Sequence, residues 1–70
     1  MDQRLFDQQL HRAIDQLSAN HRQSFILRYQ EERTVAEIAA IIGCPEGTIK
    51  SRLHYALQQV SQYLEAWKTH

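Results

Sequence analysis

The chain has 70 residues, of which 43% are hydrophobic and 23% are charged. This size and composition are typical of one small globular domain and exclude a disordered tail. Eight lysine and arginine residues balance eight aspartate and glutamate residues, so the formal net charge is zero. A domain that binds nucleic acid without help usually has a conspicuous basic face. We therefore exclude a self-sufficient, strongly basic nucleic-acid binder.

The residue types favour a helical protein of a reducing compartment. Two glycines and one proline are few for 70 residues, which predicts an all-α fold. Cys44 is the sole cysteine, so no internal disulfide is expected. The first residues lack the apolar core of a signal peptide, and no apolar run approaches transmembrane length. We expect a cytoplasmic protein with no membrane partner.

Two helices are predicted in the first half of the chain. The first has an apolar face whose members recur at spacings of three and four: Phe6, Leu10, Ala13, Ile14 and Leu17. The second is expected to begin after Ser18, a good N-cap residue, and to run to about Gln30. Residues 31–33 break the apolar pattern and are predicted to be a connector.

The third helix has a clear beginning and end. Thr34 is followed three residues later by Glu37, which predicts a capping box. Gly43 is expected to end the helix, and Pro45 to open the next one. The residues expected on its buried face are Val35, Ile38, Ala39, Ile41 and Ile42.

The fourth helix is predicted to be the longest, because no glycine or proline interrupts the sequence after Thr48. We expect it to reach at least Leu64. Its buried stripe is predicted to contain Ile49, Leu53, Ala56, Leu57, Val60, Leu64 and Trp67. The sequence therefore predicts one all-α domain over residues 1–70, with four helices, a C-terminal helix-turn-helix at about 34–58 and a long last helix.

The face of the fourth helix opposite its buried stripe suits the major groove of DNA. This face contains Gly47, Thr48, Ser51, His54, Tyr55 and Gln58, and Lys50 and Arg52 flank it. Lysine and arginine can bond guanine or phosphate, and serine and threonine adapt to either. Gly47 would let the helix N-terminus approach a phosphate closely. A merely solvated helix face is the alternative, and it explains the glutamines equally well.

The segment from Leu17 to about Leu57 resembles region 4 of bacterial sigma factors, particularly those of the extracytoplasmic-function group. The matching residues are Arg22, 25–29, 34–39 and 43–54. The resemblance implies recognition of the −35 promoter element as part of the RNA polymerase holoenzyme. It implies base contacts by Lys50 and Ser51, and further groove contacts by His54 and Tyr55. Thr48 and Arg52 match positions where phosphate contacts are expected.

The resemblance also implies protein partners, namely a flexible flap of core RNA polymerase and an anti-sigma factor. A complete sigma factor of this type has an additional promoter-melting domain, which is not present in this sequence. We therefore expect an excised C-terminal domain, with a naturally short regulator as the alternative. Tethering to a larger assembly would compensate for the modest charge. We expect the domain itself to be a monomer.

The sequence departs from the family pattern at several positions. Tyr55 stands where arginine is common, and Leu57 and Gln58 follow where another basic residue is usual. Glu32 and Arg33 replace a glycine and an apolar residue. A further departure is Ala19, which stands where proline is frequent. The missing basic residues predict weak DNA binding.

Two alternative functions remain open from the sequence. A response-regulator effector domain also has a Thr-Ile-Lys type of recognition helix, but that family usually has histidine where this chain has Arg52. A degenerate module that binds polymerase or an anti-sigma factor without reading DNA is compatible with the neutral charge and with Tyr55.

No enzyme, metal or cofactor is predicted. The four histidines, at positions 11, 21, 54 and 70, lack the paired spacing of metal ligands, and Cys44 is expected to be a packed side chain. No phosphate loop, nucleophile elbow or carboxylate pair is present.

The last part of the fourth helix has two interpretations. Leu64 and Trp67 are expected to pack on the first helix near Leu5, Phe6 and Leu10. The alternative is that they form an exposed surface for a partner.

Overall fold

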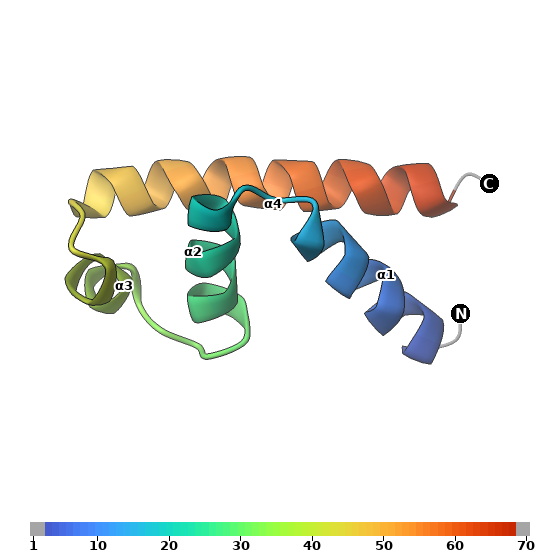
Figure 1. The fold of residues 1–70 in the computed structure, drawn as a ribbon, viewed down its shortest axis with the longest axis horizontal. Helices are drawn as coiled ribbons and strands as arrows, with labels where there is room; N and C mark the ends of the chain where they lie inside the picture. Colours follow the sequence, from blue (N-terminus) through green and yellow to red (C-terminus); the bar gives the residue numbers. More distant parts are fainter. Residues whose placement is uncertain (1–2, 69–70) are drawn as a thin grey trace.

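The computed structural model describes residues 3–68 and contains four helices (Figure 1). They are α1 (Gln3–Asp15), α2 (Ala19–Tyr29), α3 (Val35–Ile42) and α4 (Glu46–Lys68). No strand occurs within residues 3–68. The predicted all-α fold with four helices and a long last helix is therefore confirmed. His70, one of the four histidines, lies outside the described residues.

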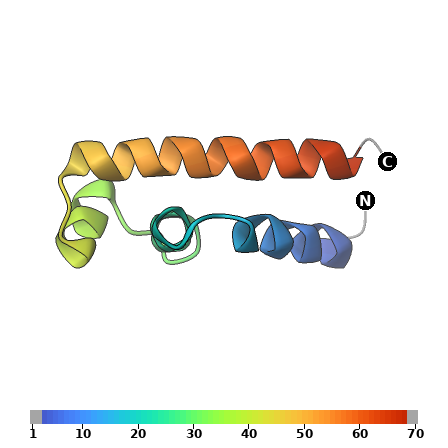
Figure 2. The same ribbon diagram turned by 45° about the horizontal axis from the view of Figure 1, so that its top comes forward.

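Helix α4 extends along the whole molecule, and the three shorter helices lie on one side of it (Figures 1 and 2). In chain order, α1 lies beside the C-terminal part of α4, α2 beside its middle and α3 beside its N-terminal part. The molecule is elongated, with dimensions of 39 × 18 × 15 Å. One side of α4 is therefore left without a covering helix.

The predicted helix ends are confirmed. The Ser18 side chain accepts a hydrogen bond from the His21 amide at 3.4 Å, which caps α2. At α3 the capping box is complete. The Thr34 hydroxyl accepts from the Glu37 amide at 3.1 Å, and the Glu37 carboxylate accepts from the Thr34 amide at 3.0 Å. Gly43 ends α3 in the left-handed conformation, with φ of 83°.

The connector between α2 and α3 is held by hydrogen bonds to the end of α2. The Arg33 amide donates to the Leu27 carbonyl at 2.9 Å, and the Arg28 guanidinium donates to the Arg33 carbonyl at 3.1 Å. Between these contacts Glu32 adopts a φ of 56°, a left-handed conformation that glycine accepts more readily. The structure thus explains why a glycine would suit position 32.

The hydrophobic core consists of two clusters, both of which include residues of α4. The cluster between α1, α2 and α4 contains Ala13, Ile14, Leu17, Phe25, Ala56 and Val60. The cluster between α3 and α4 contains Ile38, Ile49 and Leu53. Helix α4 therefore joins two otherwise separate packing units.

The interpretation of the C-terminal extension as part of the core is confirmed for Leu64. Leu10 and Leu64 both pack against the cluster shared by α1, α2 and α4. Trp67 is half-buried and lines a small hollow together with Gln9 of α1. Leu5 contributes less than expected, because 43% of its surface is exposed.

Two residues that were predicted to be buried are exposed. Ile41 of α3 has 54% of its surface exposed, and Leu57 of α4 has 46% exposed. Leu57 lies on the side of α4 that no other helix covers, about 100° around the axis from the fully buried Ala56. Ile41 belongs to a helix of only eight residues, which is covered on a single side. The predictions for these two residues are wrong because the neighbouring helices cover a narrower side of α3 and of α4 than the apolar residue pattern predicts.

Candidate nucleic-acid interface

A tight turn joins α3 to α4. The amides of Gly43 and Cys44 both donate to the Ala39 carbonyl, at 2.8 and 3.1 Å. The Pro45 carbonyl then accepts from the Thr48 and Ile49 amides at 3.1 and 3.2 Å, which starts α4. Proline fits this position because it has no amide hydrogen to leave unpaired. The turn fixes where the exposed face of α4 begins.

Cys44 is a packed residue of this turn. It is half-buried and packs against the cluster shared by α3 and α4. This confirms the predicted structural role of the cysteine.

The rotation of α4 about its axis is fixed by its buried residues. Ile49 is fully buried and Leu53 is 8% exposed, and both face α3. The opposite side of the helix therefore faces solvent from Gly47 to Gln58. The exposed residues on it are Gly47, Lys50, Ser51, His54, Tyr55 and Gln58. The structure brings these predicted contact residues together on one uncovered face.

Two of the predicted contact residues lie at the edge of this face. Thr48 and Arg52 are half-buried, whereas Lys50 and Ser51 between them are exposed. A partly buried side chain at the edge suits contact with a backbone phosphate more than penetration into a groove. Burial thus separates the exposed Lys50 and Ser51 from Thr48 and Arg52 at the edge of this face.

The N-terminus of α4 is sterically accessible. A Cβ atom added at Gly47 would meet no atom within 4 Å, so the space in front of it is open. Unpaired amides in the first turn of a helix favour an anion such as phosphate. Glu46 occupies the same turn and already places a negative charge at the helix N-terminus. A bound phosphate would have to tolerate this carboxylate.

An aromatic cluster that no local sequence pattern indicates extends this face to α2. The rings of His21 and Tyr55 stack with centroids 6.3 Å apart and planes 20° apart. His54 meets Tyr55 edge-on, with centroids 5.7 Å apart. His21, for which the sequence predicts no metal-ligand role, lies in the first turn of α2. Because this contact joins residues 34 positions apart, local sequence patterns could not have indicated it.

One carboxylate beside the interface has a perturbed pKa. The pKa of Glu37 lies below its ordinary value of 4.5, chiefly because the Thr34 amide donates a hydrogen bond to the carboxylate. The Thr34 hydroxyl and the nearby Arg33 guanidinium act in the same direction. Arg33 is 3.5 Å from Glu37, but both side chains are about half exposed, so their ion pair contributes little stability. Glu37 therefore serves the cap of α3.

Neither a metal-binding group nor a membrane-spanning helix occurs among residues 3–68. Over residues 3–68 no group of three histidine, cysteine, aspartate or glutamate side chains is placed to hold a metal ion. None of the helices described is both long enough and apolar enough to cross a membrane.

Two helices joined by a short turn, the second with an exposed polar face, define a helix-turn-helix protein. Comparison with known families then identifies the group. The family model described as "Sigma-70, region 4" matches residues 7–60, and the chain belongs to this family. The predicted resemblance is confirmed, and the response-regulator alternative is wrong. Sigma region 4 is a DNA-binding domain and not an enzyme.

Individual relatives are sigma factors of the same group. The chain is 43% identical over 53 residues to the ECF RNA polymerase sigma factor SigL of Mycobacterium tuberculosis, covering 76% of this chain and 30% of the relative. It is 40% identical over 52 residues to the RNA polymerase sigma factor SigV of Bacillus subtilis, covering 74% and 31%. The RNA polymerase sigma-E factor of Streptomyces antibioticus is 38% identical over 53 residues, covering 76% and 29%. The chain thus spans about a third of the length of these relatives.

Proposed function

We propose that this chain reads the −35 element of a promoter as part of an RNA polymerase holoenzyme. The helix-turn-helix over residues 34–58 places the N-terminal half of α4 in the major groove. Lys50 and Ser51 contact bases, and His54 and Tyr55 contact the groove further along the helix. Thr48 and Arg52 contact backbone phosphates.

The observation that supports this proposal best is the exposure of one face of α4 immediately after the turn. Lys50, Ser51 and His54 are exposed there, while Ile49 and Leu53 hold the other face against α3. A groove-reading helix needs this combination of free polar side chains and a fixed rotation. The match to the sigma region 4 family supports the same function.

The domain is proposed to act together with other proteins in the cytoplasm. Its net charge is zero, so phosphate contacts alone would give weak binding. Docking on the flap of core RNA polymerase would raise the effective concentration of the domain at the promoter. An anti-sigma factor that masks the domain is a second proposed partner. The unit that acts in this way is the single domain over residues 1–70.

The test is a titration of labelled promoter DNA with the domain fused to its polymerase flap partner. Replacement of Lys50 by alanine is expected to weaken binding by about 1–3 kcal/mol, mainly through one base position of the −35 element. The matched control is Gln8→Ala on α1, an exposed residue remote from α4's N-terminal face, which should bind as the unmodified domain does.

Equal binding of the Lys50→Ala variant and the unmodified domain on every promoter would contradict base reading by α4. The interaction module that binds polymerase or an anti-sigma factor without reading DNA would then be the better account. Far-UV circular dichroism of each variant shows whether the fold is retained.

A further inference from the structure

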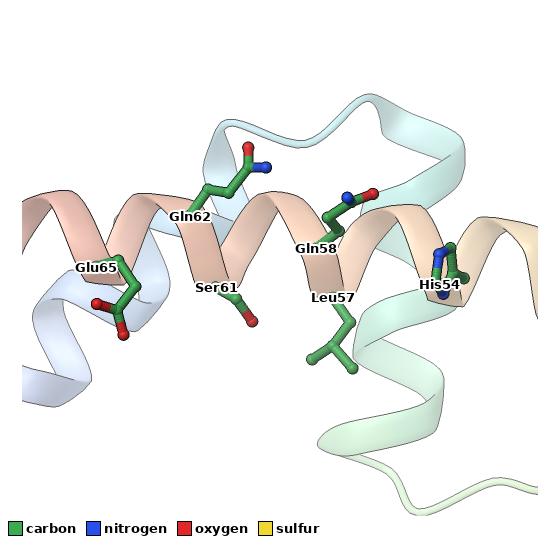
Figure 3. Close-up of a pocket in the computed structure, with 6 residues that line it drawn as sticks. All are labelled: His54, Leu57, Gln58, Ser61, Gln62 and Glu65. Carbon is green, nitrogen blue, oxygen red and sulfur yellow. The ribbon is translucent and has the colours of Figure 1, made fainter.

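An exposed face of α4 contains an apolar centre and extends from the proposed DNA contact His54 toward the C-terminus of the helix. We name it the lateral face and define it by His54, Leu57, Gln58, Ser61, Gln62 and Glu65, which line an open hollow of about 510 Å³ (Figure 3). All of them belong to α4, and no other described helix covers them. Leu57 is 46% exposed at its centre, which costs hydrophobic free energy as long as the face is uncovered.

The charges along the lateral face are arranged in a way that suits one particular occupant. Lys50 lies one helical turn before His54 on the same side of α4, and Glu65 closes the face at its other end. Positions 50 and 65 are equally distant from the midpoint between Leu57 and Gln58. A two-fold axis through this midpoint would place Lys50 of one copy opposite Glu65 of the other. The face is therefore complementary to itself.

We propose that the lateral face binds a second copy of this chain, with the two α4 helices antiparallel and their Leu57 side chains in contact at the two-fold axis. Each Lys50 then faces a Glu65, and Lys68 lies near Glu46 of the second copy. The helix dipoles also favour this arrangement, because the positive N-terminus of each α4 lies beside the negative C-terminus of the other. A parallel pair would instead place Lys50 beside Lys50, so the charges select the antiparallel arrangement. Such a contact is isologous and closes as a dimer.

The dimer is weak. A single pair of helices with serine and glutamine around one leucine buries less than the about 1,200 Å² of the smallest standard interfaces. Self-association is therefore expected only at high protein concentration and low salt. Its consequence rests on the proposed function: Lys50 and His54 lie within or beside the contact, so a dimer could not present them to DNA.

The first experiment measures self-association without DNA, by sedimentation equilibrium of the 70-residue chain from about 10 µM to about 1 mM. Lys50→Glu and Glu65→Lys should each weaken dimerisation about tenfold or more, because like charges then face each other. The Lys50→Glu/Glu65→Lys double variant should restore it to within about threefold. The matched charge control is Glu31→Lys, which adds the same two units of charge as Glu65→Lys at an exposed residue of the connector between α2 and α3 and should dimerise as the unmodified chain does.

Two results would overturn the proposal. A chain that stays monomeric over the whole range has no such interface, and the lateral face then belongs to a different protein. A dimer that the single variants leave unchanged, or that the double variant fails to restore, is not held by Lys50 and Glu65. Thermal unfolding of each variant verifies the fold, and all substituted side chains are exposed.

A second experiment separates this inference from the function on which its consequence rests. Glu65→Lys and Glu31→Lys have the same net charge, so promoter DNA is titrated with both at low salt. Above the dimerisation constant Glu65→Lys should bind DNA more tightly than Glu31→Lys, and below it the two should bind alike. Equal binding at all concentrations overturns the competition between dimer and DNA. Failure of every variant to bind DNA when fused to the polymerase flap overturns the proposed function, while sedimentation of the 70-residue chain still decides whether the dimer exists.

Discussion

The ring of His21 in α2 stacks on the ring of Tyr55 in α4, with the two planes 20° apart. Tyr55 is nevertheless 56% exposed, so one side of it remains free. The contact gives a bulky, uncharged side chain a fixed place where sigma region 4 commonly has an arginine. At this position among the proposed DNA contacts, the chain therefore has an aromatic ring packed against His21 in place of a flexible cation.

Restoring the arginine should strengthen DNA binding. A Tyr55→Arg variant adds one cation on the proposed interface, so its affinity for promoter DNA should rise several-fold at low salt. The slope of log K against log salt should steepen by about 0.9. Filter binding or fluorescence anisotropy over a series of salt concentrations measures both quantities. Gln8→Arg on α1 adds the same charge elsewhere, and an equal slope for both variants would contradict a local contact at position 55.

Replacing Glu32 by glycine should stabilise the fold. Glu32 has a φ of 56°, which disfavours a residue with a Cβ by about 1–2 kcal/mol, although glycine loses more entropy on folding. The net gain in the free energy of unfolding is expected to be about 0.5–1 kcal/mol, measured by urea titration. Glu31→Gly, at a neighbouring position without positive φ, should instead lower stability. A loss of stability in Glu32→Gly would mean that the connector does not hold this conformation.

Ser24 of α2 offers a second route to higher stability. Its hydroxyl is fully buried and has no hydrogen-bond partner among the described residues. An unpaired buried hydroxyl is costly, so Ser24→Ala should raise the free energy of unfolding by about 1 kcal/mol. Ser51→Ala, an exposed serine in α4, controls for the helix preference of alanine and should gain less. If thermal unfolding shows the same gain in stability for both variants, the buried hydroxyl of Ser24 does not destabilise the fold.

The capping box should make stability depend on acid pH. Because the pKa of Glu37 is lowered in the folded state, its charge stabilises the fold above the ordinary value of 4.5. This contribution is lost as the pH falls from 4.5 through the lower folded value. Glu37→Gln should therefore lower the free energy of unfolding by more at pH 7 than at pH 3, as measured by unfolding titrations of this variant and the unmodified chain. A difference that is the same at both pH values, or equal to that of Glu31→Gln, would contradict this role.

The local features of this fold could be predicted because each depends on neighbouring residues. The caps at Ser18 and Thr34 and the end of α3 at Gly43 follow from side-chain and backbone chemistry within one turn. The face of α4 with Lys50 and Ser51 also follows from helical spacing once Ile49 is taken as buried. These predictions needed no knowledge of how the helices pack.

The features that were missed depend on which helices cover which sides. Leu57 was predicted to be buried because it lies next to the apolar stripe, but α1 and α2 cover only the neighbouring side of α4. Ile41 is exposed for the same reason at α3. The contact between His21 and Tyr55 depends on the crossing of α2 and α4. Spacing along one helix cannot indicate such an arrangement.

Helix α4 continues without a break from Glu46 to Lys68, and both hydrophobic clusters attach to it. With a rise of about 1.5 Å per residue, Lys50 and Trp67 are separated by roughly 25 Å along a stiff axis. Their relative rotation is fixed as well, because each residue turns the helix by about 100°. A protein that held the Trp67 end would therefore also set the distance and the angle at which Lys50 is presented. The length of α4 acts as a rigid spacer between the two ends of the domain.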